Sequence, residues 1–238
     1  MPPRRAESRR VDETKLREAR REARVDAIVF VLVALALLAA LAFASYVADW
    51  ELLGVGWWVW LLIALPELVL AGELVLSSRI DDHRRSHRTL QVFFGFVVVG
   101  SASALTLLVA ALVTEKASEL TGAQLLTSGG VLWLTNAIVF GLWFWTVDDG
   151  GPVERAMKDR ETPDFLFPQD DDPERARPGW YPRLEDYTYV ALTNAIAFSP
   201  TDTMPLTRWA KVLMGAESAI SVIAVLLVAA RAVNVLGA

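Results

Sequence analysis

The stretch Ala27–Ala48, "AIVFVLVALALLAALAFASYVA", decides the fold class of this chain. Its 22 residues include only two polar side chains, Ser45 and Tyr46. A helix needs roughly 20 apolar residues to cross a hydrocarbon core of about 30 Å. The stretch follows 26 residues of charged sequence and lacks the short apolar region and cleavage site of a signal peptide, so we expect it to stay in the mature protein. The sequence therefore predicts a membrane-spanning helix.

Further apolar stretches follow along the chain. Four are long enough to span a membrane, and one, Leu184–Phe198, is shorter and more polar. The longer ones are Leu53–Ser78, Leu90–Thr114, Gly129–Val147 and Leu206–Leu236, and we read "TSGG" (Thr127–Gly130) as a turn that precedes the fourth span. The prediction is an all-α, polytopic transmembrane helix bundle with about six hydrophobic helices, the fifth of them short.

Charge patterning predicts the orientation. The arm 1–26 holds nine Lys/Arg against six Asp/Glu, and the short loop "RIDDHRRSHR" after the second span adds four arginines. By the positive-inside rule both lie in the cytoplasm, which makes the chain a multi-pass protein of the cell (inner) membrane with a cytoplasmic N-terminus. We expect the lipid bilayer to surround the chain. The charged arm either fixes the orientation of the protein in the membrane or binds anionic lipid.

These features divide the chain into four parts: the charged arm 1–26, a four-helix transmembrane region 27–147, an acidic, proline-rich cytoplasmic loop 148–183, and a final region 184–238 with a short helix, a turn and the last span. Phe165, Leu166 and Phe167 are expected to hold the loop against the helix ends. We expect 184–198 to cross completely, which places both termini in the cytoplasm and the following turn outside.

Composition excludes several classes of function. The chain has no cysteine, so disulfides, thiolate metal sites and cysteine nucleophiles are absent. His83 and His87 lie among arginines that would repel a metal ion. An acidic balance argues against a nucleic-acid partner. No catalytic triad pattern or phosphate-binding loop is present, so we expect no enzyme, no bound metal and no cofactor.

Ionisable residues inside spans are the main candidates for function, because a carboxylate in hydrocarbon is costly. Glu67, which follows the helix-kinking Pro66, either holds a proton or cation or is a protonated packing residue. Glu73 lies nearer the cytoplasmic end. Glu217 lies in the last span, in the outer half of the membrane on this topology. Thr135 and Asn136 could line a cavity or make interhelical hydrogen bonds.

Two further candidates flank a break near the end of the chain. In "NAIAFSPTDTMPL" (Asn194–Leu206), Pro200 stops the short helix and Asp202 is expected to cap its turn. Asn194 would present its amide to a cavity. Elsewhere, "WWVW" (57–60) and "WFW" (143–145) are expected to form aromatic belts, and Gly215 with Ala219 to permit close packing.

The segments "EDYTYVALT", the loop ending in Asp202 and "PLTRWAKVL" resemble the pore helix, filter and inner helix of two-helix potassium-channel pore modules. The positions that match the filter read "IAFSPT", without the glycines of such filters. Over most of its length the chain resembles a bacterial family of uncharacterised multi-span integral membrane proteins with a "DYxY" segment. This resemblance implies no activity. A second copy of the chain, in a homo-oligomer, is among the partners considered.

The leading hypothesis is passive or proton-linked permeation of an ion or solute. Glu67 would hold the proton or cation, Asn194 would face the cavity and Asp202 would attract cations at its mouth. The alternative is a structural or sensory membrane protein that does not transport and binds a cytoplasmic partner through the arm and the acidic loop.

Overall fold

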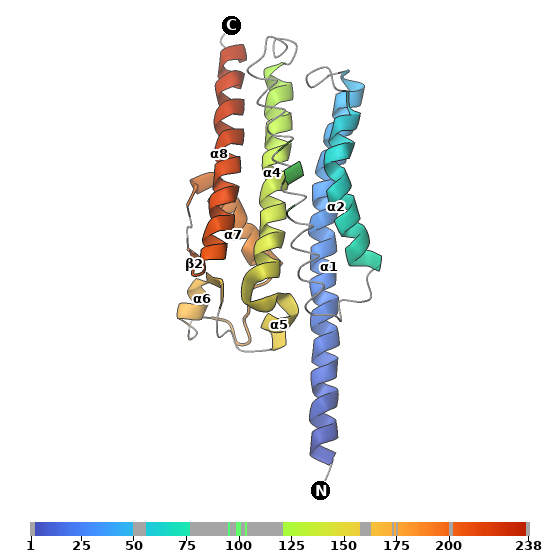
Figure 1. Ribbon diagram of the computed structural model, residues 1–238, viewed down its shortest axis with the longest axis vertical. Coiled ribbons are helices and arrows are strands. Elements are labelled where there is room, and N and C mark those ends of the chain that lie inside the picture. The colour runs from blue at the N-terminus through green and yellow to red at the C-terminus, as the bar shows by residue number, and fades with distance from the viewer. Residues whose placement is uncertain are drawn as a thin grey trace.

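The computed structural model describes residues 3–49, 56–76, 121–157, 163–172, 174, 176–199 and 202–236, together with 95, 99, 100 and 103. In these residues the chain is mostly helical, as predicted (Figure 1). The longer helices are α1 (Pro3–Val47), α2 (Trp58–Leu76), α4 (Gly122–Val147), α7 (Leu184–Ala197) and α8 (Arg208–Leu236). The shorter elements are a 3-10 turn, η2 (Asp148–Gly150), the helices α5 (Pro152–Met157) and α6 (Pro168–Asp171), and the strands β1 (Phe165–Leu166) and β2 (Met204–Pro205).

Three segments of the described chain are long and apolar enough to cross a membrane: Arg20–Val47 in α1, Gly122–Gly150 in α4 and η2, and Arg208–Leu226 in α8. The described part of α2 holds a shorter apolar stretch, Trp58–Val69. These segments suggest a multi-pass membrane protein. The predicted third span, 90–114, lies almost wholly outside the described residues, as does the arginine-rich loop 79–88.

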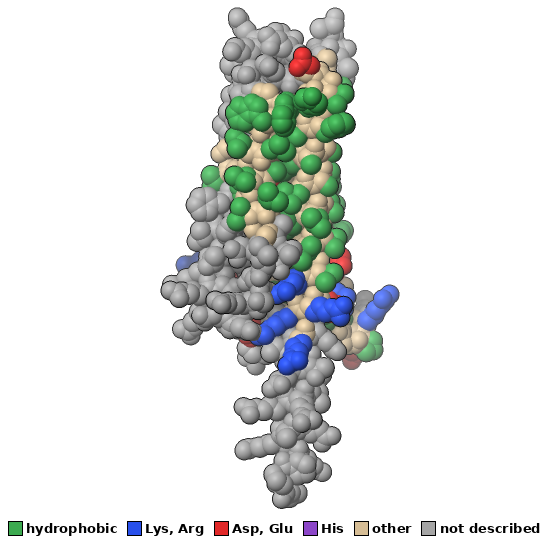
Figure 2. All heavy atoms as spheres, turned by 90° about the vertical axis from the view of Figure 1, so that its right-hand side faces the viewer, with side chains coloured by type: hydrophobic (Ala, Val, Ile, Leu, Met, Phe, Trp, Pro, Cys, Tyr) green, Lys and Arg blue, Asp and Glu red, His purple; other side chains and the backbone are tan. Residues whose placement is uncertain are grey.

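The outer face of α1 and α2 is apolar over much of its height. Figure 2 shows hydrophobic side chains covering this face, with Lys and Arg side chains gathered below them. Exposed residues of the two helices include Val29, Leu32, Phe43, Leu61, Leu65 and Leu68, each at least 45% exposed. A surface of this kind suits contact with lipid chains rather than with water.

Helix α4 begins seven residues before the predicted start of its span, so the interpretation of "TSGG" as a turn is wrong. Thr121 and Gln124 form a capping box: Gln124 N donates to Thr121 Oγ1 at 3.3 Å, and Thr121 N donates to Gln124 Oε1 at 2.8 Å. These bonds satisfy amides at the helix start that would otherwise lack partners.

Close helix packing occurs at Gly141 of α4. A Cβ atom at this position would lie 2.8 Å from the Cα of Thr188 on α7, a separation that side chains do not tolerate. Gly141 is buried, and α4 packs against α7 and α8 on one side and α1 on the other. Gly215, the predicted packing glycine, is exposed and has no described atom within 4 Å of that position.

The aromatic clusters differ from the prediction in part. Trp57 and Trp58 are 42% and 49% exposed, which agrees with a position in an interfacial belt. Trp60 is buried, and so are Trp143 and Trp145, at 8% and 6% exposed. The second cluster therefore belongs to the core between helices instead of a belt.

Helix α7 enters the bundle and the chain then returns to the end from which it started (Figure 1). β2, which follows α7, pairs antiparallel with β1, which precedes it, and Leu206 N donates to Asp164 O at 2.8 Å. The predicted complete crossing by 184–198 is therefore wrong. Its 14 residues span only about 21 Å. One consequence is that α1 begins and α8 ends at opposite ends of the bundle (Figure 1).

The predicted docking of the acidic loop is confirmed. Phe165 and Phe167 are 0% and 4% exposed and lie in the main core cluster, where Phe165 packs against Phe144 with ring centroids 5.0 Å apart. Leu166 is half-buried. The aromatic side chains thus join the loop to the end of α4.

Asp148, at the end of α4, fixes this loop through its buried carboxylate. Oδ1 accepts the backbone N–H groups of Asp164 and Phe165 at 2.6 and 3.0 Å, and Oδ2 accepts the hydroxyl of Tyr187 from α7. Arg155 Nη1 donates to the Asp148 carbonyl at 2.5 Å, and its guanidinium lies 4.9 Å from the Tyr187 ring centre. One carboxylate therefore holds the loop and the half-helix in place together.

Candidate functional site

The candidate site lies where the re-entrant helix α7 meets α8. Phe198, in a left-handed conformation (φ 56°), ends α7, and its N–H donates to the carbonyl of Asn194 at 2.9 Å. The side chain of Asn194 turns to α8 and is 1% exposed. The sequence thus places this amide on the inner face of the last complete turn of α7.

Helix α8 presents one buried face to α4 and α7. The buried residues recur at the helical spacing of three and four: Ala210, Leu213, Met214, Glu217, Ser221 and Ala224. Most of this face is apolar or small. Glu217 is the exception, because it is an ionisable side chain with 0% exposure in a candidate membrane span.

Asn194 joins α7 to α8 through its side-chain amide. Nδ2 donates to the Met214 carbonyl at 3.0 Å and to Glu217 Oε2 at 2.8 Å. Its Oδ1 accepts the hydroxyl of Ser218 at 3.2 Å. The side-chain amide is therefore hydrogen-bonded through both its nitrogen and its oxygen.

Several buried polar side chains of α4 and α8 are incompletely satisfied. Glu217 Oε1 and Ser221 Oγ are buried and have no hydrogen-bond partner among the described residues. The same holds on α4 for Thr135 Oγ1 and for both side-chain atoms of Asn136. Buried polar atoms nearly always have a partner in protein, water or an ion, so these unpaired atoms are unusual.

The other predicted site residues lie elsewhere. Glu67 is 2% exposed on α2, a helix that packs against α1 and lies across the bundle from α7 and α8 (Figure 1). Neither of its oxygens has a partner among the described residues. The side chain of Glu73 lies outside the described residues. Asp202 is exposed beside β2, where it accepts the Thr203 hydroxyl at 3.2 Å.

Glu217 lies in the first half of α8. α8 begins at the end of the bundle where α4 finishes, so Glu217, nine residues after Arg208, lies in the half nearer that end. The predicted placement in the outer half of the membrane was based on the complete crossing of 184–198 and no longer follows from it.

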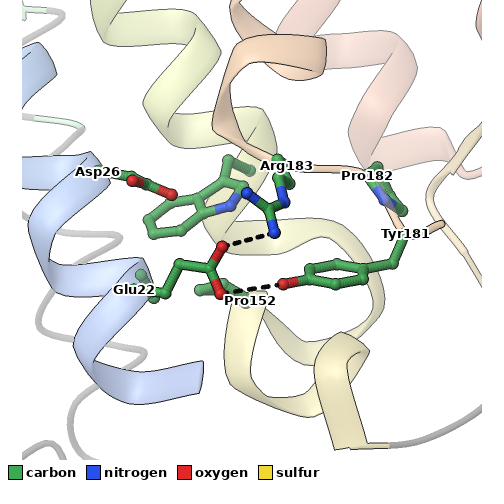
Figure 3. A pocket seen from close by; sticks show the side chains of 8 residues that line it. Glu22, Asp26, Pro152, Tyr181, Pro182 and Arg183 are labelled. Carbon is green, nitrogen blue, oxygen red and sulfur yellow. Dashed lines mark hydrogen bonds and ion pairs between the residues drawn. The ribbon is translucent and has the colours of Figure 1, made fainter. Parts of the chain in front are cut away.

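A second polar cluster, missed in the sequence, lines a small cavity between α1, α4 and the start of α7 (Figure 3). Arg183 Nη2 lies 2.6 Å from Glu22 Oε1, and Tyr181 OH donates to Glu22 Oε2 at 3.3 Å. Asp26 and Trp145 complete the wall. The space open to the centre of a water molecule is ≈ 20 Å³, enough for about one water.

In this second cluster the pKa values of two groups outside the spans, Tyr181 and Arg183, are raised above their ordinary values. Burial, and then the neighbouring Glu22 carboxylate, raise the pKa of the Tyr181 phenol above its ordinary value of 10.0. The ion pair itself is 53% exposed on Arg183 and 39% on Glu22, so solvent screens it. The geometry suits a link between α1 and the base of α7 rather than a reaction centre.

In the part of the chain that the structure describes, no three His, Cys, Asp or Glu side chains are grouped as metal ligands. Comparison with known protein families, curated protein sequences and solved structures found no match to this chain. Of the two polar clusters, the buried one is the stronger candidate for function, because its ionisable member, Glu217, lies inside a candidate span.

Proposed function

We propose that this chain is an integral membrane protein that moves protons or small cations across the bilayer, with Glu217 and Asn194 at the point of binding. One observation carries the proposal: the Glu217 carboxyl is completely buried in a candidate span, with a single described hydrogen-bond partner on one oxygen and none on the other. Ionisable groups in such positions are costly and mark ion or proton pathways.

The orientation of the re-entrant helix α7 favours binding of a positively charged substrate. α7 is a half-helix whose carboxyl-terminal turn, the negative end of its dipole, lies beside α8 at Asn194. Half-helix ends inside membrane proteins commonly face bound ions of the opposite sign. The dipole and the carboxyl together favour a proton or cation over an anion.

Flux into vesicles tests this proposal. The full chain is reconstituted in liposomes that contain a pH-sensitive dye, and a potassium gradient with valinomycin sets the membrane potential. We expect proton or cation flux above that of empty vesicles. Glu217→Gln should remove it, because the amide can still accept from Asn194 but cannot ionise.

Glu185→Gln is the matched control, since Glu185 is an exposed acid on the first turn of α7. It should leave flux unchanged. Flux that survives Glu217→Gln, or that never exceeds empty vesicles, contradicts the proposal. In the second case the alternative is favoured, a membrane protein that binds a cytoplasmic partner through the exposed acids of its loop, such as Asp171 and Glu174.

A further inference from the structure

The exposed face of α1 changes its chemistry along the helix. Arg17 and Arg21 are exposed on it. Val25, Val29 and Leu32 follow them and are 51%, 51% and 54% exposed. Successive members of this series are four or three residues apart, so all five lie on one side of the helix. The same face therefore carries cations first and apolar side chains after them.

The spacing of these residues matches the layers of a bilayer. From Val25 to Val47, where α1 ends, the helix is about 33 Å long, which is enough to cross a hydrocarbon core of about 30 Å. The headgroup layer on each side of the core is roughly 5–8 Å thick. Arg21 lies one turn, about 6 Å, before Val25, and Arg17 lies about 6 Å further out. Arg21 is thus at headgroup depth, with Arg17 at the outer edge of that layer.

The exposed face of α8 has the same order. Arg208 is exposed at the start of the helix, and Val212 follows it by four residues, the spacing found on α1. Val212, Ile223 and Leu226 share this face and are 60%, 46% and 60% exposed. Trp209, beside Arg208, is 46% exposed, and tryptophan favours the level of the headgroups.

The two sets of cations lie near the same level of the bundle. Trp209 packs against Trp143 of α4 with ring centroids 6.2 Å apart. Trp145, two residues further along α4, lines the same small cavity as Glu22 of α1. Arg21 directly precedes Glu22, so the cations of α1 and the start of α8 meet α4 close to the same point. Figure 2 shows Lys and Arg side chains gathered just below the apolar face of α1 and α2.

Glu22, the acid that follows Arg21, is engaged on another side of α1. Figure 3 shows its carboxylate directed at Arg183 and Tyr181. Its oxygens lie 2.6 Å from Arg183 Nη2 and 3.3 Å from the Tyr181 hydroxyl. The charge of Glu22 is therefore used within the bundle and not on the exposed face.

We propose that Arg17 and Arg21 of α1 and Arg208 of α8 bind the headgroups of anionic phospholipids, whose acyl chains lie along the apolar side chains of the same faces. A soluble acidic partner would contact the cations alone, whereas a lipid contacts both halves of each face. The arrangement recurs on a second helix at the same level, as a bilayer surface requires. The inference is independent of the proposed function, because lipid binding is measured without flux.

The test uses the full chain reconstituted in phosphatidylcholine vesicles that contain a trace of spin-labelled phosphatidylglycerol or spin-labelled phosphatidylcholine. Electron paramagnetic resonance gives the fraction of each lipid that the protein immobilises. We expect preference for phosphatidylglycerol, and we expect salt to reduce it because salt screens exposed charges. A basic residue at an anionic surface strengthens the attraction about fivefold, so Arg17→Gln with Arg21→Gln should lower the preference by at least that factor.

Two controls separate charge from structure and from total charge. Arg17→Lys with Arg21→Lys keeps the charges and should keep the preference. Arg177→Gln removes an exposed cation of the loop, outside both helix faces, and should leave the preference unchanged. Equal immobilisation of the two lipids, or a preference that survives the double glutamine variant, overturns the inference. Loss of the preference when inorganic phosphate is added also overturns it, since the cations would then bind a free anion rather than a lipid.

Discussion

The side-chain amide of Asn194 on α7 donates a hydrogen bond of 2.8 Å to the Glu217 carboxyl on α8, and neither side chain is more than 1% exposed. This bond ties the half-helix to the last helix at a level where water does not compete. A buried polar group that loses its partner keeps the full cost of its desolvation. The two residues should therefore behave as one energetic unit.

A double-mutant cycle measures this coupling. We expect Asn194→Ala and Glu217→Met to destabilise the protein less together than the sum of their separate effects, with an interaction energy of about 0.5–3 kcal/mol. The measurement is unfolding in detergent. Ile196→Ala, at an exposed position of α7, should instead be additive with Glu217→Met. Additivity of the first pair would show that the hydrogen bond contributes nothing.

Gly141 sets the distance between α4 and α7. We expect Gly141→Ala to cost about 1–3 kcal/mol, because the new methyl group meets the backbone of Thr188 and the helices must move apart. Thermal unfolding gives the effect. Gly130→Ala on the same helix has no described atom within 4 Å of the added carbon, and it should be neutral or stabilising. Equal effects of the two substitutions would contradict this packing.

The hydroxyl of Tyr187 donates a hydrogen bond to the buried Asp148 carboxylate. Tyr187→Phe should destabilise the protein by about 1–3 kcal/mol, since the buried acceptor Oδ2 loses this donor. Tyr189→Phe, two residues on and 53% exposed, should have little effect. Chemical unfolding gives the stability of both variants. An unchanged stability of Tyr187→Phe would contradict the role of Asp148 in holding the loop.

The raised pKa of Tyr181 predicts that the protein loses stability at alkaline pH. Its pKa is raised by burial and by Glu22, so the folded state favours the protonated phenol. That stabilisation is fully present below pH 10, the ordinary value, and is lost as the pH rises through the higher folded-state pKa. Tyr181→Phe should therefore flatten the alkaline part of the stability profile, whereas Tyr46→Phe, 63% exposed, should not. An identical slope in wild type and Tyr181→Phe is the contrary result.

The absence of cysteine makes the re-entrant path of α7 testable with single introduced thiols. Asp171→Cys and Met204→Cys are exposed positions on the two segments that the β1–β2 pairing brings together. A maleimide that does not cross membranes should label both from the same side of sealed vesicles. Ala123→Cys, at the opposite end of α4, should react only from the other side. Opposite labelling of the first two positions would restore the complete crossing.

Local sequence patterns predicted much of the fold. The apolar run after Ala27 and the final run were found as helices because length and composition alone distinguish them. The docking of Phe165 and Phe167 followed from apolar residues in an otherwise polar loop. The start of α4 is also encoded by neighbouring residues. The capping-box pattern of Thr121 and Gln124 would have predicted it.

The errors came from contacts between distant parts of the chain. The return of α7 depends on pairing of Phe165 with Pro205, and no local pattern encodes that pairing. Asn194 and Glu217 were each recognised, but their meeting depends on how two helices rotate and slide against each other. The contact of Glu22 with Arg183 was not predicted for the same reason, because the two residues are far apart in the sequence.

The position of α7 has a consequence for biosynthesis. Its described anchors Gly141, Asp148 and Arg155, together with β1, all precede it in the chain, and proteins emerge from the ribosome amino-terminus first. The half-helix can therefore dock as it is made, onto a surface already in the membrane. The contacts of α7 with α8 must wait, and among them the bond of Asn194, because Glu217 is added 23 residues later. Arrival of α8 completes the Asn194–Glu217 pair, so the buried carboxyl is the last part of the site to be assembled.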